Sequence, residues 1–184
     1  MRNLFEVESC VAEGFMHMSL CEFLVAKSII DALLRGGIKL IQSFSLPYRH
    51  FEMDFLENGL KSLKLEDARK IKENLENAYI LLMPESFREK HYPDMIKEQR
   101  WEKRLEQIGN KKLQIIRDQM IFYLGKLPEI LIENSKIFEY AFEEDESILV
   151  KISAATVIIN HDLNFDIEKK YIDYILNDEN WEKT

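Results

Sequence analysis

Three polar residues at alternate positions, His50, Glu52 and Asp54, are the best candidates for chemistry in this sequence. If they open a helix, His50 and Asp54 lie four residues apart on one face and could share a metal ion. A third ligand would have to come from His17 or His91. The alternative is an ordinary helix start, where acidic side chains stabilise the positive end of the helix. We expect no metal and no cofactor, because no complete ligand set is spaced for one.

The motifs of the common enzyme classes are absent. The sequence contains no G-x-G-x-x-G, no H-E-x-x-H and no G-x-S-x-G. Its only Gly-Lys dipeptide is Gly125-Lys126, and Met120 stands where a phosphate-binding loop needs its first glycine. None of the four histidines follows a glutamate by three residues, as di-iron bundles require. We therefore predict no catalytic residues and a protein that is not an enzyme.

Acidic side chains gather in the last third of the chain. Residues 128–184 hold 5 basic and 14 acidic side chains, net −9, whereas the first 127 residues hold 20 and 19, net +1. Such acidity favours basic partners over nucleic acid or anionic membranes, although it could also serve solubility alone. Asp145 has a second possible role, because it could cap the helix that follows it. The predicted partner-binding residues, acidic groups with aromatic anchors, are Glu143, Glu144, Asp145, Glu146, Asp162, Asp166, Tyr171 and Trp181.

The elements that must position these side chains are predicted to be helices. Apolar residues recur with helical spacing along nearly the whole chain, and six glycines and four prolines are too few for an all-β fold. We predict an all-α protein, an irregular bundle of about eight helices that forms a single domain over residues 1–184. The expected helices cover residues 19–35, 47–58, 67–83, 93–108, 110–124, 128–142, 146–160 and 166–176.

The helix expected at 146–160 is apolar nearly all round, which predicts burial on several sides. Ile152 and Ala155 are its predicted core residues. A buried β-strand is the rival interpretation, but the length of the segment favours a helix. Its polar residues Ser153, Thr156 and Asn160 fall near one another and could line a groove, or bond back to the preceding turn.

Location follows from the N-terminus and the two cysteines. The N-terminus lacks the basic region of a secretion signal, and no run approaches the roughly 18 apolar residues of a membrane helix. Cys10 and Cys21 match neither a C-x-x-C motif nor a disulfide framework, so we interpret them as free thiols in a reducing compartment. We therefore expect a cytoplasmic protein without membrane association.

Residues 145–175 resemble a HEAT-like helical repeat. Asp145, Val150, Lys151, Ala154 and Ile158 stand at the positions where such repeats carry Asp, Val, Arg, Ala and an aliphatic residue. The resemblance implies HEAT-like helix pairs in the C-terminal third, with Asp145 capping the second helix. Lys151, in place of the usual arginine, would bond neighbouring turns less rigidly. A plain irregular bundle is the alternative.

The composition as a whole is similar to that of bacterial toxin-immunity proteins, which are often small, acidic and helical. The resemblance implies an inhibitor that neutralises a basic toxin such as a nuclease. We accordingly predict a protein-binding module with a basic protein partner. The alternatives are a helical ligand-binding or regulatory domain, and an enzyme or metal protein with a site near His50, Glu52 and Asp54.

Overall fold

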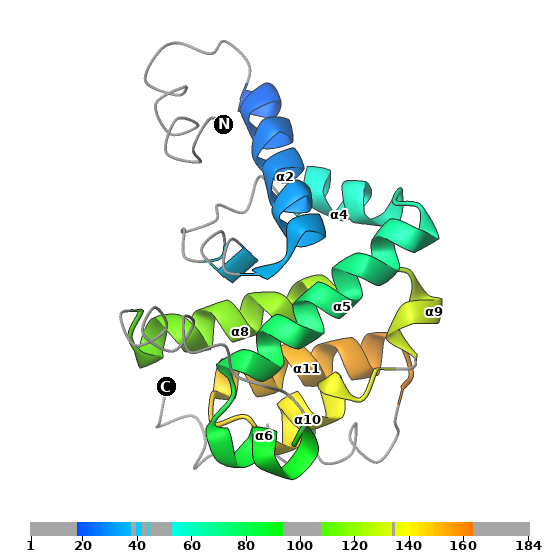
Figure 1. The fold of residues 1–184 in the computed structure, drawn as a ribbon. Coiled ribbons are helices and arrows are strands. Elements are labelled where there is room, and N and C mark those ends of the chain that lie inside the picture. Colours follow the sequence, from blue (N-terminus) through cyan, green and yellow to red (C-terminus); the bar gives the residue numbers. More distant parts are fainter. Residues whose placement is uncertain are drawn as a thin grey trace, which may run out of the picture.

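The computed structural model describes residues 18–37, 40, 41, 44, 53–93, 108–133 and 135–163 (Figure 1). Throughout this part the secondary structure is helical and no strand occurs, so the predicted all-α fold is confirmed. The described helices are α2 (Met18–Arg35), α4 (Met53–Lys61), α5 (Leu65–Leu82), α6 (Glu85–His91), α8 (Asn110–Leu124), α9 (Glu129–Ile132), α10 (Ile137–Glu144) and α11 (Ile148–Asn160).

Helix α5 crosses the middle of the molecule and joins its two halves (Figure 1). On one side it packs against α2, which pairs with α4. On the other side it packs against α8, which pairs with α11, and α11 in turn pairs with α10. One hydrophobic cluster contains buried residues from α2 through to α11, so both halves share a continuous core.

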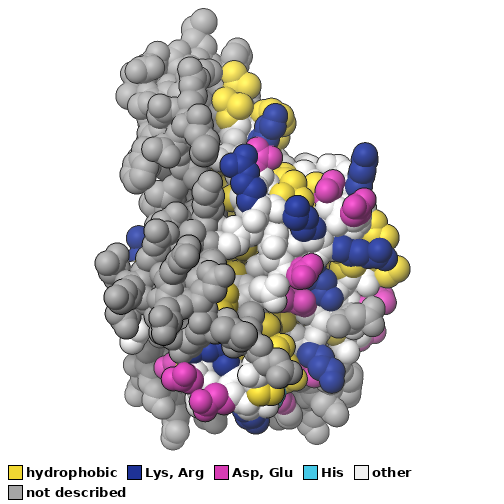
Figure 2. Space-filling model, viewed as in Figure 1, with side chains coloured by type: hydrophobic (Ala, Val, Ile, Leu, Met, Phe, Trp, Pro, Cys, Tyr) yellow, Lys and Arg dark blue, Asp and Glu magenta, His cyan; other side chains and the backbone are white. Residues whose placement is uncertain are grey.

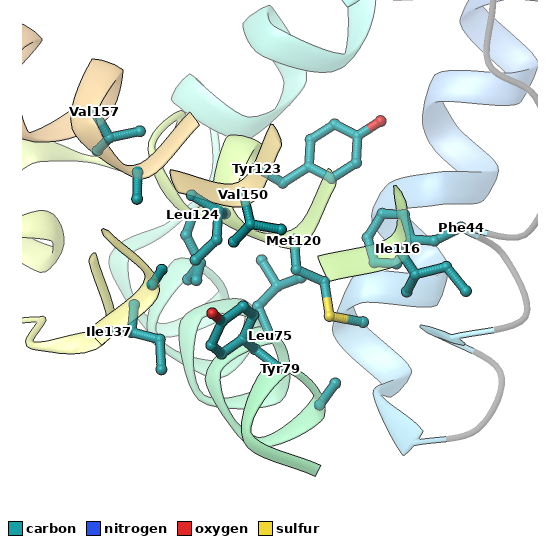
Figure 3. Packing of buried hydrophobic residues seen from close by; sticks show 14 of the residues in the cluster. Phe44, Leu75, Tyr79, Ile116, Met120, Tyr123, Leu124, Ile137, Val150 and Val157 are labelled. Carbon is teal, nitrogen blue, oxygen red and sulfur yellow. The ribbon is translucent and has the colours of Figure 1, made fainter. Parts of the chain in front are cut away.

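The apolar stripe predicted for α5 is confirmed. Ala68, Ile71, Leu75, Ala78, Tyr79 and Leu82 are buried and repeat at the three- and four-residue intervals of one helix face, and Ile80, which lies off this face, is buried as well. Figure 3 shows Leu75 and Tyr79 packed among Met120 of α8 and Val150 of α11. Because this face meets α8 and α11, α5 also brings the Tyr79 hydroxyl into the interior.

Helices α8 and α11 run in the same direction. Arg117, midway along α8, reaches Asp145 just ahead of α11, and Gly125, just after α8, lies against Val157 near the end of α11. A Cβ atom on Gly125 would lie 2.3 Å from Val157 Cγ2, so glycine permits this close approach. Helix α8 ends at Gly125 as predicted, but this glycine is needed for close packing and not for its backbone conformation, because its φ of −68° is one that any residue adopts.

The segment predicted at 146–160 forms helix α11, as expected, and not a β-strand. Ala155 is fully buried, in agreement with the prediction, but Ile152 is only half-buried. Truncation of Ile152 should therefore cost less than a fully buried position would.

Several helix boundaries differ from the predicted ones. Helix α6 was not predicted, because a proline such as Pro84 signals the end of a helix. Pro84 also stands immediately before α6, where the missing N–H of proline costs no helical hydrogen bond. The segment predicted as one helix at 128–142 is divided into α9 and α10. Gly59 does not end α4 but lies within it, where an added Cβ would lie 2.5 Å from Ile30 Cδ1 of α2. Most of the helix predicted at 93–108, and the whole of the helix predicted at 166–176, lie outside the described residues.

Candidate functional site

The acidic junction is the turn between α10 and α11 together with the helix ends that flank it, residues 143–149. Glu143 and Glu146 are exposed on its surface, and the adjacent Leu149 is 49% exposed. The sequence prediction included the two glutamates but missed Leu149. A large aliphatic side chain exposed near these carboxylates gives the junction both apolar and acidic groups, which protein interfaces combine.

Asp145 does not belong to this surface, and its prediction as a partner contact is wrong. Its side chain is 0% exposed and forms a bidentate ion pair with Arg117 of α8. Nε of Arg117 lies 2.8 Å from Oδ2 and Nη2 lies 2.9 Å from Oδ1. The hydroxyl of Tyr79 donates to Oδ2 at 2.8 Å, and the backbone N–H of Ser147 donates to Oδ1 at 2.8 Å. With four donors satisfied inside the protein, this carboxylate has no capacity left for a partner.

The structure places Asp145 at the start of α11, close to the helix-capping role that was its alternative. Asp145 accepts the N–H of Ser147, the N-cap residue of α11, and the Ser147 side chain itself forms no capping hydrogen bond. Lys151, the counterpart of the HEAT arginine, donates instead to the backbone carbonyl of Glu143 at 3.2 Å. The resemblance to HEAT-like repeats remains a prediction.

The Asp145 cluster, which consists of Tyr79, Arg117 and Asp145, fixes the junction electrostatically. Burial raises the pKa of the Tyr79 phenol well above its usual value, and the negative charge of Asp145 raises it further, so the hydroxyl stays protonated and donates. Burial alone would lower the pKa of Arg117, but the bonds and charge of Asp145 outweigh it and hold that pKa above its usual value. Arg117 therefore keeps its charge in a bidentate pair that is shielded from water.

Glu144 is only half available. Its side chain is 28% exposed and pairs with Lys90 at 3.0 Å and with His91 Nε2 at 2.7 Å, both from α6. The hydrogen bond from Lys90, with a smaller contribution from His91, holds the pKa of Glu144 below its usual value. The His91 ring lies between Phe87 and Tyr140, with centroids 4.8 Å and 4.4 Å away. These contacts make Glu144 part of the attachment of α6 to α10.

Asp162 is exposed, but it lies at the other end of α11. It has a φ of +50° and follows the helix C-terminus, where its N–H donates to Ile159 and the N–H of Leu163 donates to Ile158. The 13 residues of α11 separate it from the junction by about 20 Å. The structure therefore does not gather Asp162 with Glu143 and Glu146 into one patch. Asp166, Tyr171 and Trp181 lie outside the described residues.

The metal hypothesis rests on residues that the structure mostly does not describe. His50 and Glu52 lie outside the described part, and Asp54 is placed there only as a residue of α4. Elsewhere in the described ranges, no three His, Cys, Asp or Glu side chains are grouped so that they could hold a metal ion. None of the described helices is both long and apolar enough to cross a membrane.

Arg117 is the residue that sequence reasoning missed, although the sequence carries a signal for it. It stands four residues after Leu113 and four before Ile121, so a charged group lies on the apolar face of α8. A charge on a buried face needs a buried partner.

Comparisons with protein-family models, with curated proteins and with solved structures find no match.

Proposed function

We propose that this chain is a protein-binding module whose contact surface is the acidic junction, and that its partner is a basic protein. The observation that carries the proposal is the combination of exposed Glu143 and Glu146 with the exposed Leu149, on a turn anchored by the buried Asp145 cluster. The carboxylates would steer a basic surface toward the junction, and Leu149 would supply the contact that excludes water.

A fixed turn favours binding. Asp145 ties the three residues between α10 and α11 to α5 and α8, so the junction loses little conformational freedom when a partner docks. On the face seen in Figure 2, Lys or Arg and Asp or Glu side chains are interspersed, so that face offers no single-sign field to a basic partner.

In its most concrete form the partner is a toxin, for example a nuclease, whose basic cleft the junction would cover in place of nucleic-acid phosphates. We place this activity in the cytoplasm, consistent with the absence of a disulfide pattern in the sequence. The α10–α11 pair, as a HEAT-like unit, would be the element that presents the surface.

The test is a comparison of two matched triple variants in partner capture from native lysate. The test variant changes the junction by Glu143→Lys, Glu146→Lys and Leu149→Ser. The control changes α9, which also exposes two glutamates around an aliphatic residue that is 59% exposed. Its substitutions are Glu129→Lys, Glu133→Lys and Ile130→Ser.

We expect the wild type and the control to retain a basic partner that the junction variant loses, while all three keep the same helical circular dichroism. The on-rate of the purified partner should fall as salt rises, because exposed charges are screened over about 8 Å at physiological ionic strength. An acidic partner, or equal loss by both triple variants, would show that the junction is not the contact surface.

A further inference from the structure

A half-buried carboxylate that forms no ion pair within the described part of the structure lies beside the acidic junction. Asp118 of α8 accepts a hydrogen bond from the Ser153 hydroxyl of α11, across the line where the two helices meet. In the described part of the structure, this hydroxyl is its one hydrogen-bond partner and no ion pair forms at Asp118. Burial raises the pKa of this carboxyl above its usual value and the nearby charge of Asp145 raises it further, which outweighs the opposite effect of Ser153.

Apolar side chains flank this carboxylate on both helices. Ile115, three residues before Asp118, is 41% exposed, and Leu149, four residues before Ser153, is 49% exposed. Residues three and four apart are neighbours on a helix surface, and α8 and α11 run in the same direction. Ile115 and Leu149 therefore lie on the same side of the Asp118–Ser153 bond, toward the junction. We call these four residues the α8–α11 seam.

Two of the described cations on these helices, Arg117 and Lys151, have partners elsewhere. Arg117 turns inward to Asp145, and Lys151 donates to the carbonyl of Glu143. Lys111 and Lys112 precede Asp118 by seven and six residues on α8, about 9–10 Å along the axis. A partly buried carboxylate that lies near another negative charge and lacks a counter-ion destabilises the fold. Such positions are typical of binding surfaces.

We propose that the α8–α11 seam receives an arginine side chain of the basic partner, with the guanidinium on Asp118 and the methylene stem against Ile115 and Leu149. The inference rests on the proposed function, which it deepens by naming the anchoring group. Arginine suits the seam better than lysine, because the guanidinium is weakly hydrated and forms a planar pair with a carboxylate at an apolar surface. Charge complementarity favours this occupant over an apolar one.

The experiment uses a single side chain as the probe, so it does not depend on the partner. The full-length protein is titrated with N-acetyl-L-argininamide, and NMR follows the methyl groups of Ile115 and Leu149 and the carboxyl carbon of Asp118. N-acetyl-L-citrullinamide, which has the same shape without the charge, is the control, at ionic strength matched with sodium chloride. We expect saturable shifts with a Kd on the order of 1–10 mM for arginine. The pKa of Asp118 should fall as the probe binds.

Two variants make the result specific. Asp118→Asn should weaken binding by about tenfold or more, since it removes a charge-assisted bond. Leu149→Asn should weaken binding while the pKa of Asp118 in the unbound protein stays raised, which also covers the case that Asp118→Asn misfolds. Glu129→Gln, on the exposed surface of α9 and outside the junction, is the control that should leave probe binding within about twofold.

Equal shifts with citrullinamide, equal binding of N-acetyl-L-lysinamide, or an unchanged affinity in both Asp118→Asn and Leu149→Asn would overturn the inference. That result would leave the proposed function standing if the junction triple variant still loses its partner. Conversely, probe binding at the seam together with an unaffected junction variant would refute the proposed function alone.

Discussion

Removal of Asp145 should destabilise this protein more than any single change at its surface. Asp145→Ala would leave the Arg117 guanidinium buried at 5% exposure with no counter-charge, and the Tyr79 hydroxyl and Ser147 N–H without their acceptor. Breaking a buried ion pair by removing one partner costs about 3–5 kcal/mol. Domains of this size are stable by roughly 5–15 kcal/mol, so a large part of the total would be lost.

The contributions within the Asp145 cluster can be separated by a double-mutant cycle. Tyr79→Phe removes one hydrogen bond to a charged group and should cost about 1.5–3 kcal/mol, because Asp145 keeps its guanidinium partner. Arg117→Met and Asp145→Leu should each cost about 3–5 kcal/mol, but the double variant should cost less than their sum by about 0.5–3 kcal/mol. The double variant has no unpaired charge in the interior.

Urea unfolding followed by far-UV circular dichroism measures each free energy of unfolding. Equal slopes of free energy against urea across the set would show that the variants unfold from comparable states. The reasoning is refuted if the single variants unfold within about 1 kcal/mol of wild type. It is refuted equally if the two losses add without coupling, because a bidentate pair at 2.8 and 2.9 Å must be coupled.

Three further changes test the description of α8 and α11. Because burial raises the pKa of Asp118, the folded state holds this proton more tightly than the unfolded state, and stability present at low pH is lost as the pH rises through the folded-state pKa. Asp118→Asn should therefore raise the Tm at pH 7 and leave it unchanged below about pH 3; a lower Tm at pH 7 would contradict this. Gly125→Ala should cost about 1–3 kcal/mol in urea unfolding, because its Cβ would overlap Val157, and Val157→Ala in the same chain should recover much of the loss. Asp162→Asn should stabilise the protein by about 0.3–1 kcal/mol, since it removes a negative charge from the C-terminus of α11 and keeps a residue that tolerates positive φ; destabilisation would mean that the carboxylate makes a contact of its own.

The helices that sequence predicted best are those with a strong apolar period and a plain stop. In α5 the stripe from Ala68 to Leu82 specifies both the helix and its buried face. The predicted helix boundaries were wrong where one residue type is compatible with more than one local structure. Pro84 ends α5 and begins α6, and Gly59, normally a helix breaker, is retained inside α4 because Ile30 occupies the space of its side chain. The position of Gly59 inside a helix depends on a side chain from another helix, which the periodicity of α4 alone does not reveal.

The candidate site was harder to predict than the fold, because pairing between charges is a tertiary property. Asp145 and Arg117 are 28 residues apart, and nothing in the order of residues distinguishes that partner from the nearer Lys151. Burial of each could have been inferred separately. Arg117 interrupts an apolar face, and Asp145 precedes a helix start where a carboxylate has a structural use. The two inferences together would have suggested their pairing.

The carboxylates around the junction show why net charge overstates a binding surface. Asp145 is paired internally with Arg117, and Glu144 is paired with Lys90, so both add less to the field that a partner meets than a free carboxylate would. Both instead hold α10 and the turn in place. Glu146 remains exposed, and Asp118, which was absent from the predicted contact residues, has a pKa that burial raises above its usual value. A basic partner gains most where a carboxylate lacks a cation within its own fold, so Asp118 should contribute more to recognition than its modest exposure suggests.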